Sequence, residues 1–231
     1  MSAAGRRAPP APVLFACALA FSACAGRDGG QGPAGVTGAD SSASPLPNVV
    51  LQTQDGRSVR FYDDLVKGRV VMINFMFTTC RRACPGTTTN LRRVQRALRD
   101  HVGRDLVMLS VSLDPEHDTP EVLKEYARVY GAGPGWYFLS GRREEIELLR
   151  RRLGVYDLNR VRDADRTRHA GLVVLGNEPM ERWSAISGRA KPRQIVEAVE
   201  RVMERPEDWK PATWSGGRAP PASSECAAPH A

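Results

Sequence analysis

The sequence predicts an α/β domain, a central mixed sheet flanked by helices with a β-hairpin at its N-terminal end. Two observations lead to this prediction. Between residues 46 and 205, segments of strand character alternate with segments whose apolar residues recur at helical spacing. Two of the strand segments, 70–77 and 106–113, are almost continuously apolar, which is typical of strands buried on both faces. A segment of this length is long enough to bury a sound core.

The first two predicted strands, 49–53 and 58–61, are joined by the turn sequence Asp55-Gly56 and form the hairpin. A helix start is indicated by 118–121, where a polar cap precedes a proline and an acid. The central elements are a buried strand at 70–77, a helix carrying Leu91, Val94 and Leu98, and a second buried strand at 106–113. The helix after 121 has an apolar stripe, which consists of Val122, Leu123, Tyr126, Val129 and Tyr130.

The remaining elements complete the domain. They are a short strand at 136–139, a helix carrying Ile146, Leu149 and Leu153, a hairpin of 172–175 and 180–186 with its turn at Gly176-Asn177, and a last helix carrying Ile195, Val199 and Val202.

Composition excludes several classes of protein. The 231 residues are 42% hydrophobic and 26% charged, as in ordinary soluble proteins. No apolar run reaches the ~20 residues of a membrane-spanning helix, so an integral membrane transporter is excluded. The five cysteines are odd in number and unevenly placed, which excludes a disulfide-scaffold miniprotein. The net charge is +7, but acids and bases interleave without a basic-plus-aromatic stripe, so we expect no nucleic-acid partner.

The N-terminal residues 1–23 are predicted to be a signal peptide, because a positive start precedes a short apolar stretch. The small residues before Cys24 resemble the lipobox of bacterial lipoproteins, which implies that Cys24 is lipidated; plain cleavage near Ala23 is the alternative. Residues 24–45 have the composition of a flexible linker, and 206–231 that of a disordered tail. We therefore expect an exported protein of the bacterial periplasm or the outer face of the cell membrane, held by a lipid anchor.

Cys80 and Cys84 follow directly after the first buried strand, which is where α/β folds place their ligand sites. The four-residue spacing puts both sulfurs on one face of a helical turn. Such a pair can clamp a soft metal ion, copper(I) above all or zinc, or form a disulfide. A structural disulfide is the plainest alternative, but it would close only a five-residue segment and remove little chain entropy.

Three motifs in order resemble the Sco/SenC family: 74–85 around the two cysteines, 110–120 with its Asp-Pro-Glu-His-Asp-Thr-Pro sequence, and His169-Ala-Gly-Leu. The resemblance covers residues 46–205. It implies a thioredoxin-like fold and a copper site built from Cys80, Cys84 and His169. It also implies a metallochaperone, rather than a turnover enzyme, for the dinuclear copper site of cytochrome c oxidase. The alternative is a thiol–disulfide oxidoreductase whose redox pair is Cys80 and Cys84, reducing that site's cysteines without carrying metal. The implied partners are the copper-site subunit of the oxidase and other periplasmic copper carriers or thiol reductants.

The sequence departs from the family pattern at two positions. Arg81 stands where proline is common, and Arg82 follows it; their guanidinium groups are expected to lower the thiol pKa. Arg168 stands where aspartate is frequent before the histidine. Asp114, at the end of its strand, could orient the site or cap a turn. Cys226 and His230 in the tail could bind a metal, but we interpret Cys226 as a free, disordered thiol.

Overall fold

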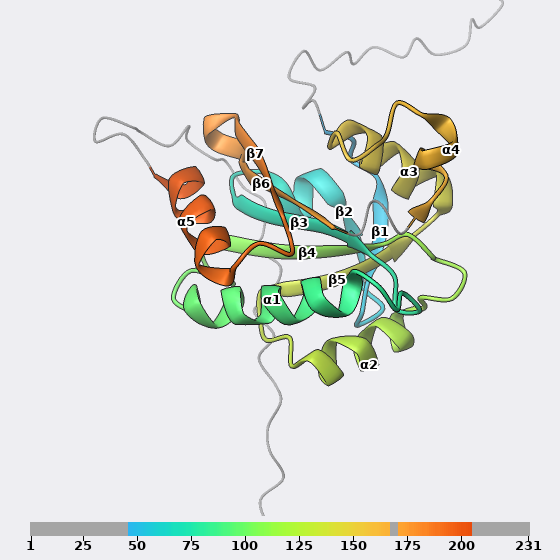
Figure 1. Ribbon diagram of the computed structural model, residues 1–231, viewed down its shortest axis with the longest axis horizontal. Helices are drawn as coiled ribbons and strands as arrows, with labels where there is room; N and C mark the ends of the chain where they lie inside the picture. The colour runs from blue at the N-terminus through green and yellow to red at the C-terminus, as the bar shows by residue number, and fades with distance from the viewer. Residues whose placement is uncertain (1–45, 167–170, 205–231) are drawn as a thin grey trace, which may run out of the picture. The chain divides into compact units, whose positions relative to one another are not determined.

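The computed structural model describes residues 46–166 and 171–204, which form a seven-stranded sheet with helices on both faces (Figure 1). Its strands lie in the order β2-β1-β5-β4-β3-β6-β7. The elements are β1 Val50–Thr53, β2 Ser58–Arg60, η1 Phe61–Val66, β3 Val70–Met76, α1 Cys84–Ala97, β4 Leu106–Ser112, α2 Pro120–Tyr130, β5 Trp136–Gly141, α3 Arg143–Arg152, α4 Arg160–Asp163, β6 Leu172–Asn177, η3 Glu178–Met180, β7 Arg182–Ser187 and α5 Pro192–Met203.

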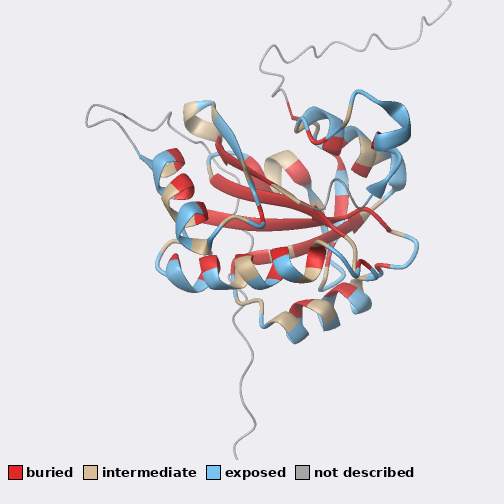
Figure 2. Cartoon of the chain, in the orientation of Figure 1, coloured by how far each residue is buried: buried red, intermediate tan, exposed pale blue. Residues whose placement is uncertain are grey.

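The sheet is mixed, as predicted. β3, β4 and β5 run parallel to one another. On one side of them, β6 is antiparallel to β3 and β7 to β6; on the other side, β1 is antiparallel to β5 and β2 to β1. Every residue of β3 and β4 is buried, so these two strands form the centre of the molecule (Figure 2). The predicted N-terminal hairpin is confirmed, with Gly56 in its turn at a φ of 74°.

Two apolar clusters lie on opposite faces of the sheet because side chains alternate along each strand. Val70 and Met72 are close to α1, α2 and α5 in one cluster, which also contains both cysteines. Val71 and Ile73 are in the other, with residues of η1 and α3. The helix that follows the cysteines therefore packs on the first face.

Two local expectations were wrong, and two short helices were not predicted. The hairpin turn after β6 lies at 178–181 rather than at Gly176-Asn177, because β6 continues through Asn177 in register with Arg182. On α2, the side chains facing the core are Leu123 and Ala127, while Val122 and Val129 are exposed by 40% and 64%. η1 and α4 had no counterpart in the sequence prediction, since each is too short to show a period.

Among the described residues, no helix is both long enough and apolar enough to cross a membrane.

Candidate functional site

The two cysteines lie where the chain leaves β3 and enters α1. β3 ends at Met76, the chain bends through residues 78–83, and Cys84 is the first residue of α1. Cys80 therefore precedes the helix, and the expectation that both sulfurs share a helical turn was wrong. They are still adjacent, because the Cys84 backbone N–H donates to Cys80 Sγ at 3.5 Å. Both are unbridged thiols in this structure, with exposed fractions of only 5% and 1%.

The surroundings give the two thiols opposite acidities. Burial opposes ionisation of Cys80, but hydrogen bonds from the Cys84 thiol and from the backbone N–H groups of Cys84, Arg82 and Ala83 outweigh it, so the pKa of Cys80 is lowered. Burial, together with donation of its proton to Cys80, raises the pKa of Cys84 to about 12. Cys80 is thus the more acidic thiol of the pair, and Cys84 is the thiol that donates to it.

The predicted lowering of a thiol pKa is confirmed for Cys80 but not for Cys84, and its cause differs from the one expected. Arg81 and Arg82 are exposed, and their guanidinium charges are not among the causes of either shift. The lowering comes first from the Cys84 thiol and then from backbone N–H groups that converge on Cys80 at the start of α1. Any residue at position 81 would leave the N–H of residues 82 to 84 in place.

A buried carboxylate holds the chain just before the cysteines. Asp118 is fully buried, with 0% exposure. It accepts hydrogen bonds from the Thr78 backbone N–H at 3.1 Å, from the Thr78 hydroxyl and from the Ser112 hydroxyl. Because Ser112 ends β4 and Thr78 lies two residues before Cys80, Asp118 fastens the bend of the cysteine loop to the neighbouring strand. Sequence reasoning had assigned Asp118 to the start of α2 and missed this role.

A second anchor lies at the carboxyl end of β4. Arg166 donates to Asp114 Oδ1 at 2.8 Å and to the Leu113 carbonyl at 3.2 Å, and its guanidinium lies over the Phe77 ring at 5.9 Å. His117 Nδ1 lies 3.4 Å from the other oxygen of Asp114. Burial opposes ionisation of Asp114, but Arg166 and His117 hold its pKa below the usual value. Asp114 therefore holds the chain at Arg166 against the end of the sheet that carries the cysteines.

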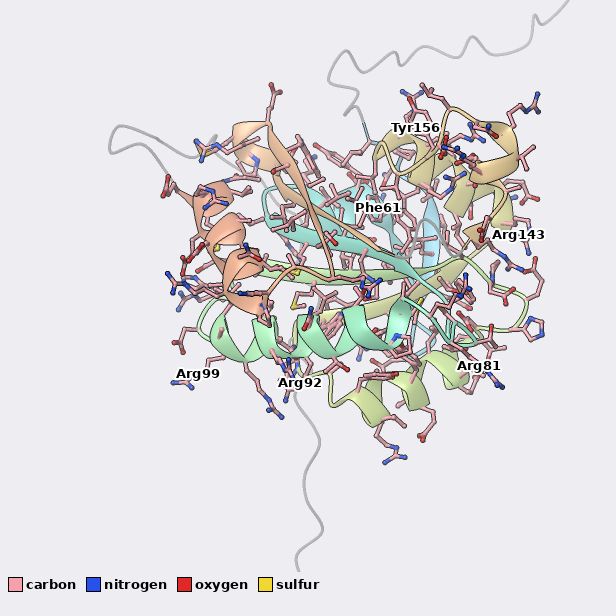
Figure 3. The ribbon with its side chains drawn as sticks, viewed as in Figure 1. Phe61, Arg81, Arg92, Arg99, Arg143 and Tyr156 are labelled. Carbon is pink, nitrogen blue, oxygen red and sulfur yellow. The ribbon has the colours of Figure 1, made fainter. Side chains whose placement is uncertain are left out.

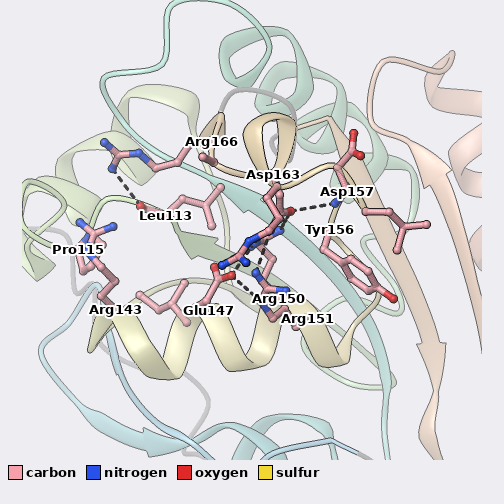
Figure 4. A pocket seen from close by; sticks show the side chains of 14 residues that line it. Leu113, Pro115, Arg143, Glu147, Arg150, Arg151, Tyr156, Asp157, Asp163 and Arg166 are labelled. Atoms are coloured by element: carbon pink, nitrogen blue, oxygen red, sulfur yellow. Dashed lines mark hydrogen bonds and ion pairs between the residues drawn. The ribbon is translucent and has the colours of Figure 1, made fainter. Parts of the chain in front are cut away.

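The chain leading to Arg166 is held by a network of charges around a cavity of about 820 Å³ (Figure 4). Arg150, only 3% exposed, donates to both oxygens of Asp163 at 2.7 and 2.8 Å and to Glu147. Arg151 donates to the same two acids. These bonds join α4 to α3 and so hold in place the chain between α3 and Arg166.

A row of polar side chains crosses the core beneath the cysteines. The Trp136 indole N–H donates to Ser110 Oγ at 2.9 Å, and Ser110 donates to Asn74 Oδ1 at 2.7 Å. These three residues come from β5, β4 and β3, and all are buried. Polar residues at alternate positions of otherwise apolar strands were the sequence signal that could have revealed it.

The structure brings together only part of the predicted site. Within residues 46–166 and 171–204, no group of three or more His, Cys, Asp and Glu side chains lies close enough to hold a metal ion. Cys80 and Cys84 are adjacent. His169 and Cys24 lie outside the described residues, as do 1–23, 24–45 and 206–231.

Fold and site together define a thioredoxin-like α/β protein with two cysteines between a buried central strand and the helix that follows it. The family model described as SCO1/SenC matches residues 47–204, and the chain belongs to that family. The resemblance drawn from the three motifs is therefore confirmed.

Relatives and solved structures agree with this assignment. The "SCO1 protein homolog" of Bacillus subtilis is 37% identical over 99 residues, covering 42% of this chain and 50% of the relative. The chain thus matches about half the length of that relative. Among solved structures, a SCO1/SenC family lipoprotein from Bacillus anthracis is 25% identical, with a TM-score of 0.56 over 69% of this chain and 95% of that one.

Two further structures concern the chemistry of the site. ScoI of Bradyrhizobium japonicum with copper bound is 25% identical, with a TM-score of 0.52 over 66% of this chain and 96% of that one. BsSco, a member of the Sco family of cytochrome c oxidase assembly proteins in which a disulfide switch was identified, is 26% identical, with a TM-score of 0.54 over 67% of this chain and 90% of that one.

Proposed function

We propose that this protein is an extracytoplasmic metallochaperone that binds copper through Cys80, Cys84 and His169 and serves the dinuclear copper site of cytochrome c oxidase. Copper is its cargo and not a resident cofactor. The copper-bound relative and the oxidase-assembly relative support the proposal, together with the position of the cysteines.

One observation carries the proposal. The cysteines and the residues that flank 167–170 lie at the same end of the sheet, where the parallel strands β3 and β4 have their carboxyl ends. Arg166 is bonded to the chain at the carboxyl end of β4. On the other side, the Gly171 carbonyl accepts from Gly188 N–H at 2.8 Å, and β6 begins beside the end of β3, with Val173 paired to Asn74. Arg166 and Gly171, the described residues on either side of 167–170, thus lie at the end of the sheet that carries Cys80.

The donor set suits a transferable copper ion. Two thiolates and one imidazole are soft enough for copper(I) and acceptable to copper(II), and three ligands leave room for an incoming donor from a partner. Because both cysteine ligands must be deprotonated, copper binding displaces the proton of Cys84 and whatever proton Cys80 retains.

The test is an anaerobic copper titration of the reduced full chain. We expect one copper per chain, and at least a tenfold weaker affinity with an altered spectrum for His169→Ala. His101→Ala is the matched control, because that imidazole lies beside Asp105, at a Nδ1–Oδ2 distance of 3.2 Å, and not at the site. If His169→Ala binds copper as tightly as the wild type and with the same spectrum, the three-ligand site is wrong.

The unequal acidities of the two thiols favour a second candidate function, a thiol–disulfide oxidoreductase that reduces the oxidase cysteines without carrying metal. A lowered pKa at Cys80 beside a protonated Cys84 suits attack on a disulfide followed by resolution. The reduction potential of the pair decides this function. A value below about −300 mV, typical of structural disulfides, would exclude exchange.

The surrounding segments complete the proposal: a signal peptide at 1–23, a linker at 24–45, the folded domain at 46–205 and a tail at 206–231, with a lipid on Cys24. A lipoprotein among the solved family members supports the anchor. Mass spectrometry of the membrane-bound protein should find a diacylglyceryl adduct on Cys24, and Cys24→Ser should release the protein from the membrane fraction. Partners other than the oxidase subunit would be periplasmic copper carriers or thiol reductants, with no nucleic acid.

A further inference from the structure

The outer surface of α1 is cationic without compensating acids. Residues 65–99 contain no aspartate or glutamate, and neither do residues 182–196. In contrast, α2, α3, α4 and α5 all carry acids. Six exposed cations on α1 and its neighbouring loops are here called the arginine face: Arg81, Arg82, Arg93, Arg96, Arg189 and Lys191.

The fold brings the two acid-free stretches together. The Asn90 side chain on α1 donates to the carbonyls of Gly188 and Ala190, both at 3.1 Å, in the loop before α5. Arg189 lies between these two acceptors, and Arg93 lies one helical turn beyond Asn90 on the same side of α1. The cations of the two stretches therefore border one another on one surface.

The arginine face is left without ion-pair partners among the residues that the structure describes. Several exposed arginines elsewhere lie against carboxylates, as Arg128 does with Glu125, Arg142 with Glu145 and Arg193 with Glu197. On α1 the arginines crowd one another instead: burial and the nearby Arg96 charge lower the pKa of Arg92. A surface that keeps like charges together at a cost to stability is suited to an anionic partner.

The position of the arginine face relates it to the cysteines. Arg81 and Arg82 follow Cys80 directly, and α1 carries Arg93 and Arg96 about 14 and 18 Å along its axis from Cys84 at 1.5 Å per residue. Figure 3 shows Arg92 and Arg99 pointing away from the sheet, with Arg81 near the opposite end of α1. Arg81 and Arg82 therefore place part of this charge directly beside the cysteine loop.

We propose that the arginine face docks an acidic protein surface whose own metal-binding or disulfide-forming cysteines are thereby brought to Cys80, an inference that rests on the function proposed above. Guanidinium groups pair with carboxylates through two parallel hydrogen bonds, which favours a defined orientation. No large exposed apolar or aromatic side chain lies within 81–99 or 188–196. The face thus offers neither the stacking platforms of single-stranded nucleic-acid binding nor the apolar groups that enter a lipid surface.

The experiment measures binding of the full chain to a fluorescent twelve-residue peptide with six glutamates and no cysteine, and to its lysine counterpart. At low salt we expect the glutamate peptide to bind at least tenfold more tightly than the lysine peptide. This preference should fall to within about twofold at high salt, because exposed charges are screened.

Arg93→Glu/Arg96→Glu should weaken binding of the glutamate peptide at least tenfold. The matched control is Arg160→Glu/Arg162→Glu, which makes the same change in net charge at two exposed positions of α4. We expect less than a twofold effect from this control. Equal losses in the two variants would overturn the proposal, because the peptide would then sense only net charge. Tighter binding to phosphatidylglycerol vesicles or to oligothymidine than to the glutamate peptide would also overturn it.

Copper titration of the same variants keeps this inference separate from the proposed function. Arg93→Glu/Arg96→Glu should bind one copper with unchanged affinity while losing the peptide. Normal copper binding without a peptide preference would refute the docking surface alone. Failure of the wild type to bind copper would refute the metallochaperone alone, since the peptide contains no ligand for the cysteines.

Discussion

Replacing Asp118 with asparagine tests whether this buried carboxylate holds the cysteine loop. Asparagine has the same shape, but it puts an NH₂ group where an oxygen now accepts from Thr78 or Ser112. Loss of one hydrogen bond to a charged acceptor costs about 1.5–3 kcal/mol, and a buried donor left unsatisfied costs about 1–3 kcal/mol more. Allowing for rotation of the two hydroxyls, we expect Asp118→Asn to lower the free energy of unfolding by about 3 kcal/mol.

Urea denaturation followed by circular dichroism measures this loss, and thermal unfolding should show a decrease of about 6–12 °C in Tm for a domain of this size. A second measurement concerns the site itself. Because Thr78 lies two residues before Cys80, release of its backbone N–H should let the loop open. We expect iodoacetamide to alkylate Cys80 at least tenfold faster in the variant.

Two controls accompany the Asp118 variant. Asp100→Asn changes an acid whose side chain is 82% exposed and should alter neither quantity. Thr78→Val removes the hydroxyl but keeps the backbone N–H, and should cost about 1 kcal/mol. The double variant should then show coupling, since Asp118 and Thr78 share a bond. If Asp118→Asn unfolds at the wild-type urea concentration, or if it is destabilised while alkylation of Cys80 is unchanged, the carboxylate does not hold the loop.

Four further predictions concern protons and charges. Cys84→Ala should raise the pKa of the Cys80 thiol, because a donor to its thiolate is lost, whereas Cys84→Ser keeps a hydroxyl donor and should raise it less; the pH dependence of alkylation measures both. With its pKa at about 12, Cys84 must release its proton on metal binding, so copper affinity should rise about tenfold per pH unit near neutrality in competition titrations, and a flat profile would contradict this. The same raised pKa stabilises the reduced fold below the ordinary thiol pKa, and that contribution should be lost as pH rises towards 12. Arg150→Met should lower the free energy of unfolding by about 3–5 kcal/mol in urea because it strips Asp163 of its buried partner, while the exposed Arg152→Met should have little effect.

The parts of the fold that the sequence predicted are those whose signal is local. β3 and β4 are continuous apolar runs, and their burial on both faces follows directly from that pattern. The cysteines were placed correctly at the carboxyl end of β3, because the run ends three residues before Cys80 and a helical period resumes after Cys84. The rule that α/β folds place ligand sites at the carboxyl ends of their strands then identified the pair as the candidate site.

What the sequence could not predict depends on contacts between distant residues. Asp118 belongs to a sequence typical of a helix cap, but Thr119 supplies the cap by accepting from Val122 N–H at 3.4 Å. Asp118 is therefore free to turn inward and meet Thr78, which is 40 residues earlier in the chain. The bond between Asp114 and Arg166 spans 52 residues and is equally invisible to local periodicity.

The effect of Arg81 and Arg82 was misjudged for a related reason. Sequence proximity to Cys80 suggested that their charges would act on the sulfur. The side chains are instead exposed to solvent, where a high dielectric constant weakens their influence, while the Arg82 backbone N–H donates to the sulfur.

The burial of both sulfurs has a kinetic consequence. With exposures of 5% and 1%, neither Cys80 nor Cys84 offers the approach that a bulky oxidant or a stray disulfide needs. Attack must wait for a local opening, and an opening that costs about 2.7 kcal/mol leaves roughly 1% of molecules reactive at any moment. A partner that stabilises the opened loop raises that fraction, whereas a reagent that merely collides does not. The buried pair thus distinguishes partners by the rate of reaction as well as by affinity. It can also stay reduced in surroundings that would oxidise an exposed pair.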